Sequence, residues 1–186
     1  MSDETVLDAQ RLGGLFVELS EALEARQQTA QLFVVGGAAI ALAYDNGRHT
    51  RDVDAVFEPS TTIRQLSEEL AGRHGLEADW INDAAKGFMP GQDSDPRTVF
   101  ESDSLLVQVA SPEYLLAMKL HSGRVERDID DAVMLYRMVG YTTPEEGIAL
   151  LESRYPPWLL LPRHRYIVQD VAARAAQGDD ATDQHS

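Results

Sequence analysis

Two carboxylates and a pair of glycines stand near each other early in the chain. Gly36-Gly37 closes a short apolar run, and Asp52-Val53-Asp54 opens the next one within VVGGAAIALAYDNGRHTRDVDAVFE, residues 34–58. Side chains alternate between the faces of a strand, so we expect Asp52 and Asp54 on one face. Two carboxylates on one partly buried face repel each other unless a cation or a proton offsets their charge. Mg²⁺ prefers such oxygen ligands and is usually shared with substrate phosphates, so the pair is a candidate metal site.

The glycine pair is suited to binding a phosphate. A strand expected over 31–35 ends at Gly36-Gly37, and an alanine-rich helix is expected over 38–44. A helix N-terminus presents free N–H groups and a positive dipole end, and glycine lets a phosphate approach the main chain closely. A phosphate site beside a metal site suits metal-assisted transfer from a nucleoside triphosphate.

The glycine pair and the Asp-x-Asp motif each have an ordinary explanation as well. Asp-x-Asp is often the solvent face of an edge strand, and Gly-Gly is often a turn. Their order along the chain favours the site: strand, glycine pair, helix, turn at Asp45-Asn46-Gly47, then the strand with Asp-x-Asp.

The elements around these residues predict an α/β (α+β) fold with a small mixed sheet flanked by helices. Helical spacing begins near the N-terminus, over 5–26, and recurs over 61–74; further strands are expected over 51–57, 76–81, 98–101 and 105–110. From Ser111-Pro112 onward the pattern predicts only helices, over 112–123, 126–138, 144–154 and 163–176. We therefore expect an α/β core in residues 1–110, a helical part in 111–176 packed on it, and a disordered acidic tail in 177–186.

Composition excludes several classes of function. The formal net charge of −15 argues against non-specific binding to nucleic acid, which depends on Lys and Arg neutralising phosphates. The chain has no cysteine, and no apolar run approaches the roughly 20 residues that span a bilayer. The first residues, MSDETVLDAQ, are acidic and lack the basic and apolar regions of a signal peptide. We expect a cytoplasmic protein with no membrane partner.

The motifs resemble those of the nucleotidyltransferase superfamily. Its signature is a strand ending in Gly-Gly or Gly-Ser, a short helix and an acidic-x-acidic strand, and here Arg48-His49-Thr50-Arg51 leads into the acidic pair. Residues 111–135, SPEYLLAMKLHSGRVERDIDDAVML, resemble downstream motifs of small bacterial members similar to AbiEii-type toxins: a Leu-x-x-x-Lys-Leu helix containing Lys119, then Arg-Asp-x-x-Asp. The resemblance covers residues 30–138.

The resemblance implies a Mg²⁺-dependent enzyme that moves a nucleotidyl group from an NTP to a hydroxyl. The acceptor would be a tRNA 3′ end or a protein side chain, in a toxin–antitoxin setting with a partner antitoxin or toxin protein. Asp52 and Asp54 would hold the metal, Lys119 would pair with the triphosphate, and Asp131 would assist as a base or in metal binding. The implied nucleotide-binding residues are Gly36, Gly37, Ala38, Arg48, Thr50, Arg51 and Asp128.

The second set of residues has ordinary explanations too. Lys119 fits a lysine that extends from an amphipathic helix into solvent, and Asp128 and Asp131 fit a solvated acidic helix start. Arg48, Arg51, Arg124 and Arg127 either form a local RNA-binding face or make ordinary ion pairs. Trp158 is expected to pack between helices.

The sequence departs from the superfamily pattern at two points. Ala38 stands where many relatives have Ser or Thr, and the candidates for a third strand carboxylate are Glu101 and Asp103, the latter better explained by a hairpin turn. Both departures favour an alternative, a catalytically degenerate nucleotidyltransferase fold that serves as a binding or regulatory module. Retention of Asp52 and Asp54 favours the enzyme, and a nucleotide-independent metal hydrolase lacks histidine ligands.

Overall fold

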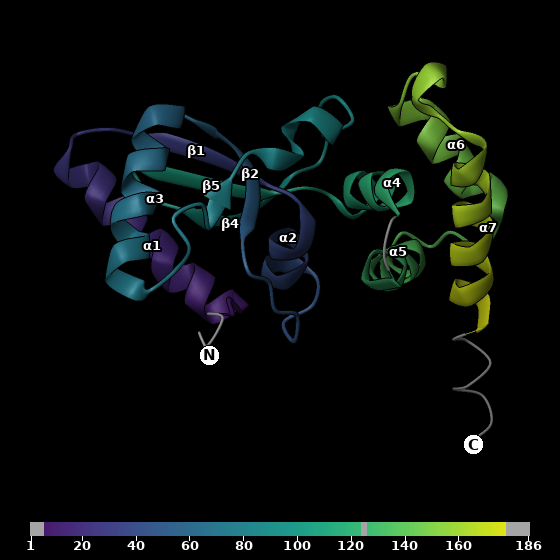
Figure 1. The fold of residues 1–186 in the computed structure, drawn as a ribbon, viewed down its shortest axis with the longest axis horizontal. Coiled ribbons are helices and arrows are strands. Elements are labelled where there is room, and N and C mark those ends of the chain that lie inside the picture. Colours follow the sequence, from purple (N-terminus) through teal and green to yellow (C-terminus); the bar gives the residue numbers. More distant parts are fainter. Residues whose placement is uncertain (1–5, 124–125, 178–186) are drawn as a thin grey trace. The chain divides into compact units, whose positions relative to one another are not determined.

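The computed structural model describes residues 6–123 and 126–177, which form a mixed α/β fold (Figure 1). Two compact units divide the chain: Met1–Gly87 with Ser94–Ala110, and Phe88–Asp93 with Ser111–Ser186. The second unit thus includes a short segment, residues 88–93, that we expected in the α/β core. Asp93 explains this grouping, because its carboxylate accepts hydrogen bonds from the N–H and the hydroxyl of Ser111. Arg124 and the acidic tail from residue 178 lie outside the described residues.

The first unit contains a five-stranded mixed sheet in the order β3-β2-β1-β5-β4. β1 lies at its centre, antiparallel to β2 and parallel to β5. The fold class predicted from the sequence is confirmed, and so is the hairpin formed by β4 and β5. The strands are β1 (Ala30–Val34), β2 (Val53–Glu58), β3 (Ile81–Asn82), β4 (Arg97–Glu101) and β5 (Leu105–Val109).

The strand predicted over 76–81 is wrong for most of its length. Only Ile81 belongs to β3, because a turn precedes it in which the Trp80 N–H bonds to the Glu77 carbonyl. That turn buries the Trp80 side chain, whose indole N–H donates to the Ser67 carbonyl. Burying a large aromatic ring with its polar atom satisfied outweighs extending a short edge strand.

Two helices of this unit, α1 (Ala9–Ala25) and α3 (Ser60–His74), pack against each other. The predicted helical spacing is confirmed, since the apolar residues of α1 at positions 12, 15, 16, 19 and 23 are all buried. A third helix, α2 (Gly36–Ala43), follows β1 directly and packs on β2 (Figure 1). The strand–glycine–helix order read from the sequence is therefore present.

The second unit is helical, and its four long helices agree with the predicted ranges within one residue. They are α4 (Pro112–Ser122), α5 (Glu126–Met138), α6 (Pro144–Arg154) and α7 (Pro162–Gln177). Two short 3-10 turns complete the described elements, η1 (Ala84–Phe88) in the chain before β4 and η2 (Pro157–Leu159) between α6 and α7.

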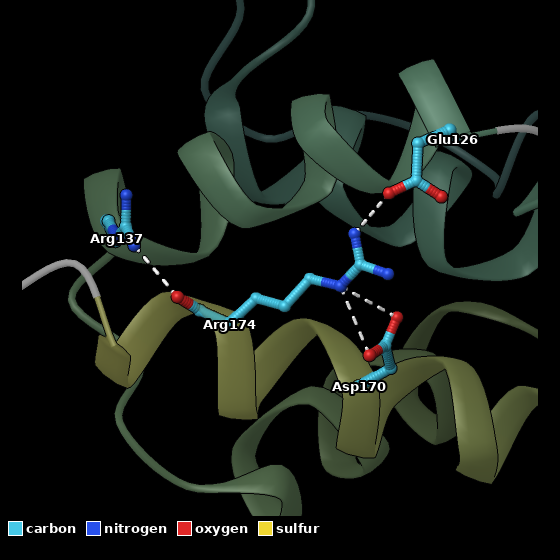
Figure 2. A network of polar contacts seen from close by, with 4 residues as sticks. All are labelled: Glu126, Arg137, Asp170 and Arg174. Carbon is cyan, nitrogen blue, oxygen red and sulfur yellow. Dashed lines mark hydrogen bonds and ion pairs between the residues drawn. The ribbon is translucent and has the colours of Figure 1, made fainter.

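Arg174 and Arg137 join α5 to α7 (Figure 2). The Arg174 guanidinium contacts Glu126 at the start of α5 and Asp170 one turn earlier in its own helix. The Arg137 guanidinium donates to the main-chain carbonyls of Arg174 and Ala175, at 2.8 and 2.9 Å. These bonds satisfy carbonyls at the C-terminal end of α7 that have no intrahelical partner.

The expectation that Trp158 packs between helices is wrong. Its side chain is 79% exposed, because η2 turns it outward while the neighbouring Tyr155 and His164 occupy the interior. None of the described helices is long and apolar enough to cross a membrane.

Candidate active site

The glycine pair and the second aspartate meet where β1 runs into α2. β1 and β2 pair with Val34 opposite Ala55, so Asp54 lies beside Val35, and the Val35 N–H donates to the Asp54 carbonyl. Gly36 has a φ of +65°, a left-handed conformation that favours glycine. A Cβ at Gly36 would stand 3.1 Å from Oδ2 of Asp54. Glycine is therefore required both for the conformation and for the close approach of the main chain to the carboxylate.

The first turn of α2 offers main-chain N–H groups beside this carboxylate. Val35 is the N-cap residue, and its side chain makes no capping hydrogen bond. Gly37 follows with Thr50 against it, since a Cβ at Gly37 would stand 3.1 Å from the Thr50 hydroxyl oxygen. Ala38 is buried and contributes only its main chain. The positive end of the α2 dipole thus faces a site that already holds one negative charge.

Asn82, which the sequence did not single out, connects the two aspartates. It pairs in register with Asp54 on the neighbouring strand, and its Nδ2 donates to Oδ2 of Asp52 at 3.3 Å. Its Oδ1 accepts the Ala84 N–H at 3.0 Å, which fixes the orientation of the amide. Asp52 itself is exposed and lies just before β2, so strand alternation does not place it and Asn82 does.

The segment that leads into β2 is anchored on both sides. Thr50 pairs with Leu7 through two main-chain hydrogen bonds, and its hydroxyl donates to the Asp52 carbonyl at 3.0 Å. Arg48 is half-buried and Arg51 is exposed on this segment. The residues expected to bind nucleotide in the α/β core therefore come from two adjacent stretches, 36–38 and 48–51, of one unit.

Neither candidate for a third carboxylate joins this site. The site lies at the end of the sheet where Val34, Val109 and Arg97 are neighbours, as the pairings of β1, β5 and β4 show. Glu101 pairs with Leu106 at the opposite end, and Asp103 lies in the hairpin turn beyond it. Within residues 6–123 and 126–177, no group of three or more acidic or histidine side chains is placed to hold a metal ion.

A second polar cluster lies in the helical unit. The Lys119 ammonium contacts Oδ1 of Asp128 at 2.6 Å and Oδ2 of Asp131 at 2.9 Å. The side chains of Lys119 and Asp131 are only 14% and 5% exposed. The ordinary explanation is therefore wrong for Lys119, which does not extend into solvent, and for Asp131, which is buried. Asp128 lies in the first turn of α5 and is 23% exposed, so a place at the helix start still describes it. Arg127 is exposed on the same helix.

Comparison with protein families decides the kind of protein. A family model described as "Nucleotidyltransferase of unknown function (DUF6036)" matches residues 10–136. The chain belongs to this family. The matched region of this nucleotidyltransferase includes the glycine pair, both aspartates, Asn82 and the Lys119 cluster.

Other comparisons add little to the family assignment. A crystal structure of an antigenic nucleotidyltransferase-like protein from Paracoccidioides brasiliensis is similar at 16% identity and a TM-score of 0.39, over 80% of this chain and 89% of that one. A similarity of this degree carries no argument about the present site. A search among curated proteins found no match.

Proposed function

We propose that this nucleotidyltransferase moves a nucleotidyl group from a nucleoside triphosphate to an acceptor hydroxyl with the help of Mg²⁺. The single observation that carries the proposal is the contact between Gly36 and Asp54. A left-handed glycine holds the start of a helix directly against a carboxylate, so a helix start that would bind phosphate and a side chain that would bind the metal lie next to each other.

The side chains at the site fit a hard cation. Asp52 and Asp54 offer carboxylate oxygens, Asn82 orients Asp52, and no sulfur ligand competes because the chain has no cysteine. Oxygen ligands of this kind suit Mg²⁺, which would neutralise charge on the phosphates of the bound nucleotide. The N–H groups of Gly37 and Ala38 would donate to phosphate oxygens, and Thr50, whose hydroxyl donates to the Asp52 carbonyl, would hold the segment before β2 against Gly37.

The reaction proposed for this site is an in-line substitution. The acceptor hydroxyl oxygen forms a bond to the α-phosphorus, the bond to the bridging oxygen breaks, and pyrophosphate leaves. The hydroxyl proton needs a base. By resemblance that base is Asp131, with Lys119 and Asp128 contributing to nucleotide binding. Support for this part of the proposal is that the three residues form one cluster, in which Asp131 is buried, inside the region that the family model matches.

The acceptor proposed by resemblance is a tRNA 3′ end or a protein side chain, within an AbiEii-like toxin–antitoxin setting. The net charge of −15 limits any RNA-binding face to a local group of arginines, such as Arg48 and Arg51 in the α/β unit. Labelling RNA and protein fractions with an α-phosphate-labelled NTP distinguishes the two acceptors.

A second candidate is a nucleotidyltransferase fold that binds nucleotide without turnover. Two observations favour it: Ala38 has no hydroxyl, and Glu101 and Asp103 lie at the other end of the sheet.

Calorimetry with each NTP, with and without Mg²⁺, tests the proposal. We expect binding that requires Mg²⁺ and is lost in Asp52→Ala/Asp54→Ala. The matched control is Glu101→Ala/Asp103→Ala, which removes the same charge from the opposite end of the sheet and should bind normally. Binding without release of pyrophosphate on addition of acceptor would favour the second candidate. No NTP binding at millimolar concentration would refute both.

A further inference from the structure

Residues 158–166 of the helical unit expose several apolar and positively charged side chains, which is unusual for this acidic chain. Of the eight large apolar side chains that are exposed in the described residues, four lie between residues 158 and 166. Trp158 is 79% and Tyr166 72% exposed, and Leu159 and Leu161 are each nearly half exposed. Arg163 and Arg165 are exposed in the same segment. We call these six residues the tryptophan–arginine surface.

A cavity opens beside this surface. It has a volume of about 590 Å³, and Ile148, Leu151 and Glu152 of α6 line it together with Leu160, Leu161 and Arg165. A cavity of this size accepts apolar side chains from another molecule. Of the six residues of the surface, Leu161 and Arg165 line this cavity. Exposed Trp, Tyr and Arg are the residue types that dominate binding energy at protein interfaces.

The main chain of the surface is held in place from beneath. The Leu161 N–H donates to Nδ1 of the buried His164 at 2.9 Å, and the Leu159 carbonyl lies 3.3 Å from Nε2 of His121. The His121 ring stacks between those of Tyr155 and His164. A surface whose main chain is already ordered loses less conformational entropy when a partner binds. These contacts therefore favour a role for the surface in binding.

Charge identifies the partner. The sequence has 31 acidic residues and 16 Lys and Arg, yet residues 153–169 contain three arginines and no carboxylate. The helix α7 also begins here, and its first turn has no acidic residue. Its positive dipole end therefore adds to the charge of Arg163 and Arg165. Glu152 lies 3.9 Å from the Arg165 guanidinium, and both side chains are more than half exposed.

We propose that the tryptophan–arginine surface binds an acidic amphipathic segment of a partner protein. Apolar side chains of that segment enter the cavity and cover Trp158, and its carboxylates pair with Arg163 and Arg165. A second copy of this chain fits less well because two such surfaces would repel each other. A membrane fits less well because the apolar site is hollow and the net charge of −15 is repelled by anionic lipid.

A pair of synthetic helical peptides of about five turns tests this proposal. Both carry the same stripe of Leu and Phe, and the polar face is Glu in one and Lys in the other. We expect the acidic peptide to bind, with a blue shift of tryptophan emission as Trp158 is covered, and the basic peptide to bind at least about tenfold more weakly. Trp158→Ala should weaken calorimetric binding of the acidic peptide by about tenfold or more.

Charge reversal separates the proposal from non-specific association. Arg163→Glu/Arg165→Glu should reverse the preference in favour of the basic peptide. The matched control is Arg26→Glu/Arg73→Glu, which changes the net charge equally on α1 and α3 and should keep the preference for the acidic peptide. Equal binding of both peptides, or binding unaffected by Trp158→Ala, would overturn the proposal.

Three further assays test the other occupants. Trp158-dependent binding to vesicles that contain anionic lipid, or to a single-stranded RNA oligonucleotide, in place of the acidic peptide would overturn the proposal. Trp158-dependent dimerisation in sedimentation experiments without peptide would do the same.

Discussion

Replacing Gly36 with alanine tests the geometry on which the candidate active site depends. The φ of +65° lies in the left-handed region, where a Cβ costs about 1–2 kcal/mol. The added Cβ would also stand 3.1 Å from Oδ2 of Asp54, so the carboxylate must move away. We expect the free energy of unfolding to fall by roughly 1–3 kcal/mol and Mg²⁺-dependent NTP binding to weaken.

Two other glycines provide matched controls for Gly36→Ala. Gly37 lies in the same helical turn without a left-handed φ, and a Cβ there would meet only the Thr50 side chain, 3.1 Å from its hydroxyl oxygen. We expect little net change, because a gain in helix propensity of up to about 1 kcal/mol offsets that contact. Gly14 is exposed within α1 and has open space around it, so Gly14→Ala should stabilise by about 0.5–1 kcal/mol.

Trp80 reports on the unfolding of the α/β unit, which contains all three glycines. It is buried there, whereas Trp158 is 79% exposed before unfolding and changes its surroundings little. Urea titrations followed by tryptophan emission should therefore rank Gly14→Ala above the wild type and Gly36→Ala below it. Equal stability of Gly36→Ala and Gly37→Ala would refute the argument from backbone conformation. A destabilised Gly36→Ala that binds NTP normally would refute only the phosphate-binding role.

Four other substitutions have expected outcomes. Asp52→Asn should change the free energy of unfolding by less than about 0.5 kcal/mol, because the side chain is exposed, yet calorimetry should show NTP binding at least about tenfold weaker. Asn82→Ala should weaken Mg²⁺ binding about tenfold by releasing Asp52, and normal affinity would contradict this. Lys119→Met should cost about 3 kcal/mol in thermal or urea unfolding, because the buried carboxylate of Asp131 and the partly buried one of Asp128 lose their counterion. Burial, together with the nearby charges of His121 and Arg163, lowers the pKa of His164. The stability that neutral His164 contributes is therefore complete above about pH 6.5 and is lost as the pH falls through the lowered pKa. In thermal scans between about pH 7 and pH 5, the melting temperature of His164→Asn should fall less than that of the wild type.

The sequence predicted those parts of the fold that depend on local pattern. Apolar spacing located α1, and Ser111-Pro112 located the start of α4, where the Ser111 hydroxyl accepts the Tyr114 N–H. The strand–glycine–helix order located the candidate site for the same reason. Each of these signals is contained within a few consecutive residues, so no knowledge of distant contacts was needed.

Asn82, Lys119 and Trp158 show where local pattern fails. Asn82 belongs to a two-residue strand, and its importance depends on the pairing of β3 with β2. Spacing showed that Asp128 and Asp131 share a helix face, but burial of that face depends on the contact of α5 with α4. An apolar segment bounded by prolines at 156, 157 and 162 does not reveal whether Trp158 or its neighbours turn inward, because that choice depends on the stack of Tyr155, His121 and His164.

Asp54 and Asp52 differ in how much of their presence the fold itself explains. Asp54 lies against the start of α2, where a carboxylate stabilises the helix dipole, so a protein without activity has a structural reason to keep it. Asp52 is exposed and lies outside the strand, and the hydrogen bond with Asn82 at 3.3 Å contributes little to folding at such a position. Its presence, and its orientation by an amide that is itself fixed by the Ala84 N–H, fit the cation site that we propose. Asp52 is therefore the residue whose single substitution tests for a bound cation, and the double substitution of both aspartates is less informative than the single one.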